Sequence, residues 1–204
     1  MSNNNLPLIR CSWVKDDDLA LQTYHDTEWG RPCFNDQTLF EYLSLELMQA
    51  GLSWTTVLHK RQAFRDAFHH FDYHQVATMQ EDVPRLLTNP ALIRNRRKLN
   101  AIIQNAQAIL SLEASGTTFA AFVWRFVQDK PLRHQVDLTH PAPKTIPQAK
   151  ALSQALKAAG FTFVGPVISY SFMQAGGLVN DHAKTCFVSQ SPIIAKQAKL
   201  APYS

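Results

Sequence analysis

The sequence predicts an all-α protein, built as a single compact helical domain. Apolar residues recur at helical spacing in most segments between residues 36 and 160. Only seven of the 204 residues are glycine, and four of these directly follow a helical pattern, where glycine commonly ends a helix: Gly30, Gly51, Gly116 and Gly160. No internal repeat or linker divides the chain, and its length suits one domain covering residues 1–204.

Residues 36–51 and 54–71 predict the first two helices. Thr38 and Glu41 have the spacing of a capping box at the start of the first helix. Ser53 is the predicted N-cap of the second helix. Six residues of the second helix recur at helical spacing and form its predicted buried side: Trp54, Val57, Leu58, Phe64, Phe68 and Phe71.

Residues 81–103 predict a helix, a tight turn near Asn89–Ile93 and a second helix that continues to Gly116. Further helices are predicted over 117–128 and 147–160, and Pro147 lies in the first turn of the latter. Residues 133–147 predict a long loop. Residues 165–177 are ambiguous, because apolar residues alternate as in a strand, whereas a proline near the start and two closing glycines favour a helix.

The composition limits the classes of protein that the chain can belong to. Hydrophobic residues make up 46% and charged residues 18%, as is usual for a globular protein with a sizeable core. No run is long and apolar enough to span a membrane, and the N-terminus has no apolar signal region, so we expect a cytoplasmic protein without a membrane partner. Three cysteines cannot form a disulfide framework. A net charge of +4 is compatible with a polyanionic partner but does not establish one.

The stretch "NDHAKTC" contains His182 and Cys186, whose spacing places both on one face of a helix. Zinc prefers thiolate and imidazole ligands, and Cys11 and His25 near the other end of the chain supply a second pair. Four protein ligands leave no position for a water molecule, so this zinc would be structural and would join the two ends of the domain. The alternative is four unrelated core residues, because the gap between Cys11 and His25 is not that of a standard zinc knuckle. Cys33 is expected to be an inert buried thiol.

Four aromatic residues, Trp13, Tyr24, Trp29 and Trp54, are candidates for a ligand pocket. The first three lie in polar surroundings, "CSW", "TYHD" and "EWG", where a core residue would have apolar neighbours. Several aromatic faces close together would bind a flat ring, and a flat cation better still. The alternative is that they are ordinary core residues.

Glu46 shares the apolar face of its predicted helix with Tyr42, Leu43 and Ala50. A buried carboxylate is costly unless it has partners or a function, so Glu46 either takes part in a site or turns towards solvent. If it is buried, it would suit a cationic ligand or donate a proton.

A basic cluster consists of Arg94, Arg96, Arg97 and Lys98 and directly precedes a predicted helix. Cations beside a helix N-terminus are a natural binding site for phosphate. The alternative is a solvated basic surface.

Five stretches together carry a resemblance to a known family: "HDTEWG", "QAGLSWTTVLHKR", "GFTFVG", "SYSFMQA" and "GLVNDH". In this order they resemble the DNA-3-methyladenine glycosylase I family, the constitutive bacterial type within the helix-hairpin-helix superfamily. The resemblance covers about residues 11–186 and leaves 1–10 and 187–204 as tails. It implies an all-helical enzyme that hydrolyses the N-glycosidic bond of 3-methyladenine in alkylated DNA.

The resemblance also implies roles for the candidate residues. It implies one structural zinc per chain, bound by Cys11, His25, His182 and Cys186. Glu46 falls on the essential pocket carboxylate, and the pocket aromatics fall on Trp13, Tyr24, Trp29 and Trp54. Residues 84–103 correspond to the helix-hairpin-helix. The expected enzyme is a monomer without lyase activity, which binds double-stranded DNA and flips the alkylated base into its pocket.

Some positions depart from the family pattern. Leu47, followed by Met48, stands where a small residue is common, and the stretch of residues 18–21 lacks a common aromatic residue. Ala91 and Arg97 replace common hairpin glycines. Residues 98–116 hold no aspartate of the kind that other members of the superfamily use after the hairpin. Two alternatives therefore stay open: a non-catalytic DNA- or base-binding module whose pocket has closed, and a zinc hydrolase.

Overall fold

The computed structural model describes residues 8–189, and most of these residues form helices. The α-helices are α1 (Leu19–Thr27), α2 (Asp36–Gln49), α3 (Trp54–His59), α4 (Arg61–Ala67), α5 (Tyr73–Val76), α6 (Val83–Thr88), α7 (Arg96–Ala114), α8 (Phe119–Trp124), α9 (Pro147–Ala158) and α10 (Pro166–Ala175). The short 3-10 helices are η1 (His69–Phe71), η2 (Met79–Asp82) and η3 (Arg125–Val127). The predicted all-α fold is confirmed.

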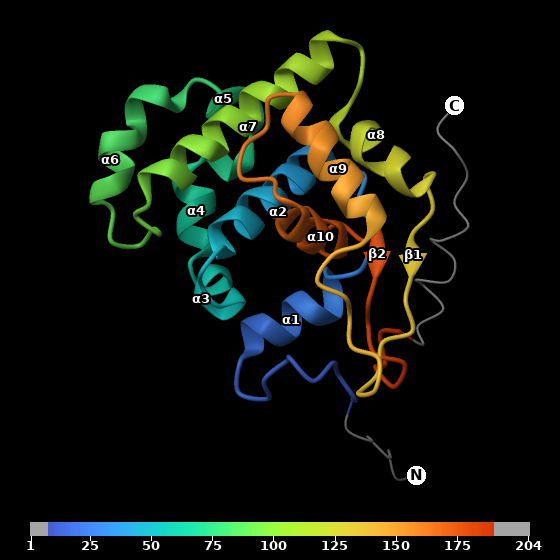
Figure 1. The fold of residues 1–204 in the computed structure, drawn as a ribbon. Helices are drawn as coiled ribbons and strands as arrows, with labels where there is room; N and C mark the ends of the chain where they lie inside the picture. Colours follow the sequence, from blue (N-terminus) through green and yellow to red (C-terminus); the bar gives the residue numbers. More distant parts are fainter. Residues whose placement is uncertain (1–7, 190–204) are drawn as a thin grey trace, which may run out of the picture.

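Helices α2 and α10 form the centre of the fold, with α7 and α9 packed around them (Figure 1). Ten consecutive residues of α2, from Leu39 to Met48, are buried, because neighbouring helices cover the helix on all sides. Gly177 ends α10 with a φ of +71°, and a Cβ there would lie 2.1 Å from the carbonyl carbon of Arg31. Only glycine permits this close approach, which fixes the end of α10 against the chain that follows α1.

Two short strands join the segment before α9 to the segment after α10. Strand β1 (Leu132–Arg133) pairs in parallel with β2 (Val179–Asn180), and an isolated bridge joins Val136 to Ala183. The predicted loop over 133–147 thus begins as a strand. The ambiguous segment 165–177 contains helix α10, for which Pro166 supplies the first residue.

The structure corrects two details of the predicted helices. The predicted helix 54–71 is broken at Lys60 into α3 and α4 and ends in η1, because His69 and His70 adopt positive φ angles. Helix α2 begins one turn earlier than the capping box predicts. Its N-cap is Asn35, whose side chain accepts a hydrogen bond from the Thr38 amide.

The four glycines predicted to end helices all adopt positive φ angles, between +71° and +91°. This left-handed conformation closes a helix at little cost only for glycine. Within residues 8–189, no helix is long and apolar enough to cross a membrane.

Candidate functional site

The structure brings together the four predicted metal ligands, although Cys11 and His182, for example, lie 171 residues apart in sequence. The ligand atoms of Cys11, His25, His182 and Cys186 all lie within 4.8 Å of one another, and all four residues are buried. Both cysteine sulfurs lie 3.5 Å from His182 Nδ1, and Cys186 Sγ lies 3.5 Å from His25 Nε2. Two thiolates and two imidazoles around one point form a donor set that fits a tetrahedral metal ion such as zinc.

Neighbouring groups orient the two imidazoles. His25 Nδ1 donates to Asp26 Oδ1 at 2.7 Å, and Arg10 holds that carboxylate through two of its nitrogens. His182 Nε2 donates to the Trp29 carbonyl at 2.9 Å. These hydrogen bonds leave His25 Nε2 and His182 Nδ1 unprotonated, as a metal ligand requires, and direct both nitrogens to the cluster.

The four-ligand cluster joins the two ends of the described chain. Phe187 N donates to Ile9 O at 2.8 Å, and the fully buried Val188 packs against Cys11 and Cys186. Residues 9–10 and 187–189, which lie outside the stretch of 11–186 that carries the family resemblance, thus pack with this cluster. The predicted tails otherwise fall largely in 1–7 and 190–204, which lie outside the described residues.

A small cavity of about 240 Å³ lies beside the metal ligands. Its walls include all four predicted aromatic residues and the predicted carboxylate: Trp13, Tyr24, Trp29, Trp54 and Glu46. Helices α1, α2 and α3 supply Tyr24, Glu46 and Trp54 respectively. The structure thus assembles in one place residues that the sequence predicts for one site.

The aromatic rings form two packed pairs in this cavity. Trp13 meets Trp29 edge to face at 5.0 Å, and Tyr24 lies 5.0 Å from Trp54. Trp13 and Trp29 also contact the metal-ligand imidazoles, at 5.3 Å from His25 and 4.7 Å from His182. The cluster of candidate metal ligands therefore supports one wall of the aromatic cavity.

Three polar atoms in the cavity wall are buried and have no hydrogen-bond partner among the described residues. They are Glu46 Oε2, the Tyr24 hydroxyl and Trp54 Nε1. A folded protein rarely leaves such groups unpaired, because each costs about 1–3 kcal/mol. Three of them facing one cavity indicate a ligand that supplies the missing partners.

Glu46 is buried, which excludes the alternative that it turns towards solvent. Burial raises the pKa of its carboxyl group to about 8, because no neighbouring cation offsets the loss of hydration. Burial also raises the pKa of Tyr24 well above its usual value, so its hydroxyl stays a neutral donor. The cavity wall thus holds an acid with a raised pKa, which a cationic ligand can convert to a carboxylate.

Glu41, one turn earlier on α2, has a different environment. Its carboxylate accepts from Arg61 Nε at 2.5 Å and from Arg65 Nε at 2.7 Å, and Arg61 also binds Glu28 at the end of α1. Glu41 is therefore a buried ion-pair residue that joins α2 to α4, and the predicted capping role is wrong.

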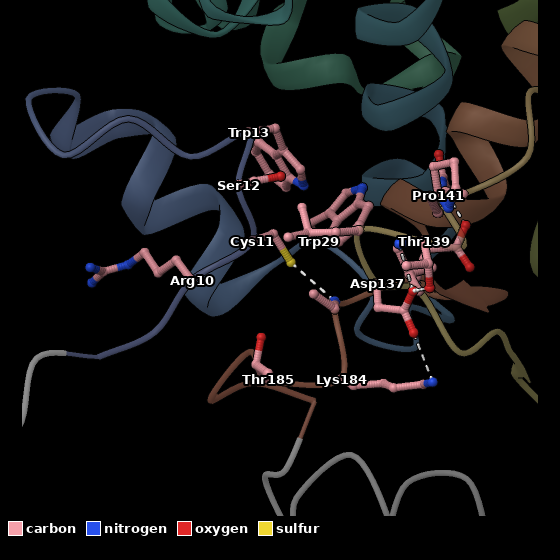
Figure 2. A pocket seen from close by; sticks show the side chains of 16 residues that line it. Arg10, Cys11, Ser12, Trp13, Trp29, Asp137, Thr139, Pro141, Lys184 and Thr185 are labelled. Atoms are coloured by element: carbon pink, nitrogen blue, oxygen red, sulfur yellow. Dashed lines mark hydrogen bonds and ion pairs between the residues drawn. The ribbon is translucent and has the colours of Figure 1, made fainter.

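Three polar residues of the cavity were not predicted from the sequence: Gln49, Ser171 and Gln174. Ser171 and Gln174 come from α10, whose apolar residues alternate as in a strand, so that its sequence did not assign a helical face to either residue. Gln174 also lines a larger adjoining cleft of about 800 Å³ between residues 10–13 and the loop after β1. Figure 2 shows Trp13 and Trp29 side by side on one wall of this cleft, with the Asp137–Lys184 ion pair at 2.9 Å on another.

The basic cluster is divided between solvent and the interior. Arg94, Arg96 and Arg97 are exposed, in and just after the turn between α6 and α7. Lys98 is buried, and its ammonium group donates to the carbonyls of Met48 at 2.8 Å and Ala50 at 2.6 Å. The assignment of Lys98 to phosphate binding is therefore wrong, because its charge holds the end of α2.

Comparisons with known proteins agree with this geometry. The sequence profile of the family described as methyladenine glycosylase matches residues 13–189. The DNA-3-methyladenine glycosylase of Haemophilus influenzae is 47% identical over 178 residues, which cover 87% of this chain and 96% of that protein. The DNA-3-methyladenine glycosylase 1 of Escherichia coli is 51% identical over 178 residues, which cover 87% of this chain and 95% of that protein.

Solved structures give the same result. A crystal structure of 3-methyladenine DNA glycosylase I matches with a TM-score of 0.85 and 51% identity, over 88% of this chain and 98% of that chain. A structure describing 3-methyladenine recognition by the Staphylococcus aureus 3-methyladenine DNA glycosylase I matches with a TM-score of 0.81 and 39% identity, over 84% of this chain and 92% of that chain. With a family profile across nearly all of its described residues and relatives this similar, the chain belongs to the methyladenine glycosylase family.

Proposed function

We propose that this protein is a DNA repair glycosylase, which flips 3-methyladenine out of alkylated DNA and hydrolyses its N-glycosidic bond. The observation that carries the proposal is the aromatic cavity in which Glu46, Tyr24 and Trp54 each present an unpaired, buried polar atom. A flat cationic base fits such a cavity, because aromatic faces attract cations and the carboxylate balances their charge.

The chemistry needs little acid assistance. A base inside a duplex cannot be reached, so it must be flipped into a pocket. Methylation at N3 gives adenine a positive charge and weakens its bond to the sugar. In the proposed reaction the bond between C1′ and N9 breaks with its electron pair going to the base, and water adds to C1′ and releases a proton. Unmethylated adenine is neutral, so it gains less from the cavity and leaves poorly.

Glu46 is the proposed catalytic carboxylate. Burial raises the pKa of Glu46 to about 8, so without a neighbouring cation its protonated form is favoured at neutral pH. When a cationic base enters, the carboxylate form becomes favourable, the proton passes to solvent, and an ion pair forms where the dielectric constant is low. This charge stabilises the cationic base and the positive charge that develops on the sugar as the bond breaks.

The four-ligand cluster is proposed to bind one structural zinc ion per chain. Zinc would neutralise the two thiolates and cross-link the ligands, and no step of the reaction passes through it. Four protein ligands complete a tetrahedral shell, so this donor set supports a structural ion and not a zinc hydrolase.

Helices α6 and α7 with their connecting turn are proposed to be a helix-hairpin-helix that binds the DNA backbone. The Asn95 side chain caps α7 by accepting from the Lys98 amide at 3.2 Å. The exposed Arg94, Arg96 and Arg97 supply positive charge near this helix start. We expect a monomer, because one chain supplies the hairpin, the cavity and the metal ligands.

The non-catalytic alternative predicts a cavity closed by Leu47 and Met48. Both residues instead lie fully buried in the main core and do not line the cavity. The cavity remains open, which favours the enzyme over a binding module.

The proposal is tested by single-turnover release of 3-methyladenine from methylated DNA. Glu46→Gln keeps the size of the side chain but removes the charge, and we expect excision to slow by about 100-fold. The matched control is Glu81→Gln, because Glu81 is exposed in η2 and lies outside the cavity. Circular dichroism checks the fold of both variants. Wild-type excision rates in both variants would contradict the role of Glu46, and a wild-type protein that releases no base would contradict the function.

A further inference from the structure

Gln174, near the end of α10, lines both the aromatic cavity, here called the base cavity, and the larger cleft beside it. Its backbone carbonyl accepts a hydrogen bond from Gly30 N at 2.9 Å, which fixes this residue beside Trp29. Its side-chain amide Nε2 donates to Asp181 Oδ2 at 2.6 Å. A carboxylate accepts and cannot donate, so this contact determines which end of the amide faces Asp181.

Asp181 is itself held in place. It is buried, and besides Gln174 it accepts a short hydrogen bond from the Tyr170 hydroxyl and one from His134 Nδ1 at 2.7 Å. With three donors around it, the carboxylate cannot turn away from Gln174. No described residue donates to Gln174 Oε1, so this carbonyl oxygen is the acceptor that Gln174 offers to a ligand.

The Gln174 carbonyl and the Glu46 carboxylate, from two different helices, are therefore both side-chain acceptors in the wall of the base cavity. In an adenine methylated at N3, the exocyclic amine carries the only N–H groups of the base. Guanine and hypoxanthine have a carbonyl oxygen at that position. A site built to accept from an amine rejects such a base, because two acceptors would face a third and remain unpaired.

We propose that Gln174 determines specificity for the exocyclic amine of the base: its carbonyl oxygen accepts an amine N–H, and the Asp181 carboxylate positions it to do so. This inference rests on the proposed function and names the feature of the base that the cavity recognises. Asp181 is a positioning residue, because it acts only through Gln174.

Binding of two free bases to the full-length, zinc-loaded protein tests the proposal. One base is 3-methyladenine and the other is 3-methylpurine, which has hydrogen in place of the amine. Gln174→Met keeps the length of the side chain but removes the acceptor. We expect the affinity for 3-methyladenine to fall about tenfold, the loss of one hydrogen bond, while the affinity for 3-methylpurine stays the same. The control Gln154→Met makes the same exchange on the exposed side of α9 and should leave both affinities unchanged.

A charge swap tests the role of Asp181. Asp181→Asn alone should reduce the preference for 3-methyladenine, because an amide can pair with either end of Gln174. The double variant Gln174→Glu/Asp181→Asn should restore it, since the asparagine amide donates to one glutamate oxygen and leaves the other for the base. Zinc content is measured in each variant, because Asp181 precedes His182.

The outcomes separate this proposal from the proposed function. If the wild-type protein excises 3-methyladenine but Gln174→Met keeps the wild-type ratio of affinities, the specificity role is overturned and the function stands. Equal losses for both bases would also overturn it, because they indicate a structural role. A wild-type protein that neither binds nor excises 3-methyladenine overturns the function and this inference with it.

Discussion

At the scale of single residues, Glu46 and Glu41 illustrate how environment separates two carboxylates on one helix. Both are buried, but Glu41 is paired with two arginines whereas Glu46 has an unpaired oxygen facing a cavity. An ion pair offsets the cost of burial for Glu41. For Glu46 the cost remains until a ligand arrives, which is why its pKa is raised. Glu46, which has a carboxyl oxygen without a partner, is therefore the carboxylate of this helix that suits a cationic ligand.

This difference predicts how Glu46 affects stability at different pH values. Its pKa rises from 4.5, its ordinary value, to about 8 in the folded protein. Below 4.5 both states hold the proton and there is no penalty. Between pH 4.5 and pH 8 the unfolded chain has released this proton and the folded protein still holds it. The free energy of unfolding therefore falls as the pH rises through this range. We expect the free energy of unfolding of Glu46→Gln to rise relative to that of the wild type by about 3 kcal/mol from pH 5 to pH 8, measured by urea unfolding. A difference that does not change with pH would contradict the raised pKa.

At the scale of helices, two lysines connect the hairpin to the elements that carry the cavity. Lys60, between α3 and α4, donates to the carbonyl of Ala91 at 2.9 Å in the turn before α7. Lys98, in the first turn of α7, donates to the carbonyls of Met48 and Ala50 at the end of α2. The helices that supply Glu46 and Trp54 are thus fixed to the proposed DNA-binding turn, so bound DNA and the cavity keep a constant geometry.

Lys98 and Arg96 should therefore respond differently to mutation. Lys98→Met leaves two carbonyls without their donor and should lower the free energy of unfolding by about 2–3 kcal/mol, with the salt dependence of DNA binding unchanged. Arg96→Ala should leave stability unchanged, weaken binding similarly on unrelated duplexes and reduce the salt slope by up to about one. Binding isotherms at several salt concentrations measure both slopes. A reduced slope in Lys98→Met would show that this lysine reaches phosphate after all.

The same two examples explain what could be predicted from the sequence. Helical periodicity correctly located α2, α7 and α9, because the buried stripe of a helix is local information. Residue type also selected the four side chains of the candidate metal cluster and the four aromatic residues, each set of which the structure brings together. Lys98 and Glu41 were misassigned because their partners, Met48 and Arg61, lie 50 and 20 residues away. Gln174 was missed for the same reason, since its role depends on Asp181 and on a cavity formed by three other helices.

At the scale of the whole molecule, the metal cluster joins the ends of the chain and supports the cavity. It connects residues 11 and 25 to residues 182 and 186, and its imidazoles pack against Trp13 and Trp29. The proposed zinc ion would cross-link these four side chains. Metal binding would then contribute to the free energy of folding and would support the aromatic wall.

Removal of the metal should therefore weaken base binding through the aromatic wall, because the proposed ion takes no part in the reaction itself. We expect about one zinc per chain by elemental analysis, and Cys186→Ser should lower stability by several kcal/mol because the ligand set is incomplete. Cys33→Ser is the matched control, since Cys33 is only half-buried and lies outside the cluster, and it should cost little. Chelation should reduce the melting temperature and the affinity for 3-methyladenine together, and added zinc should restore both. A metal-free protein with the same melting temperature and base affinity would contradict the structural role, because the cluster would then be four core residues that need no ion.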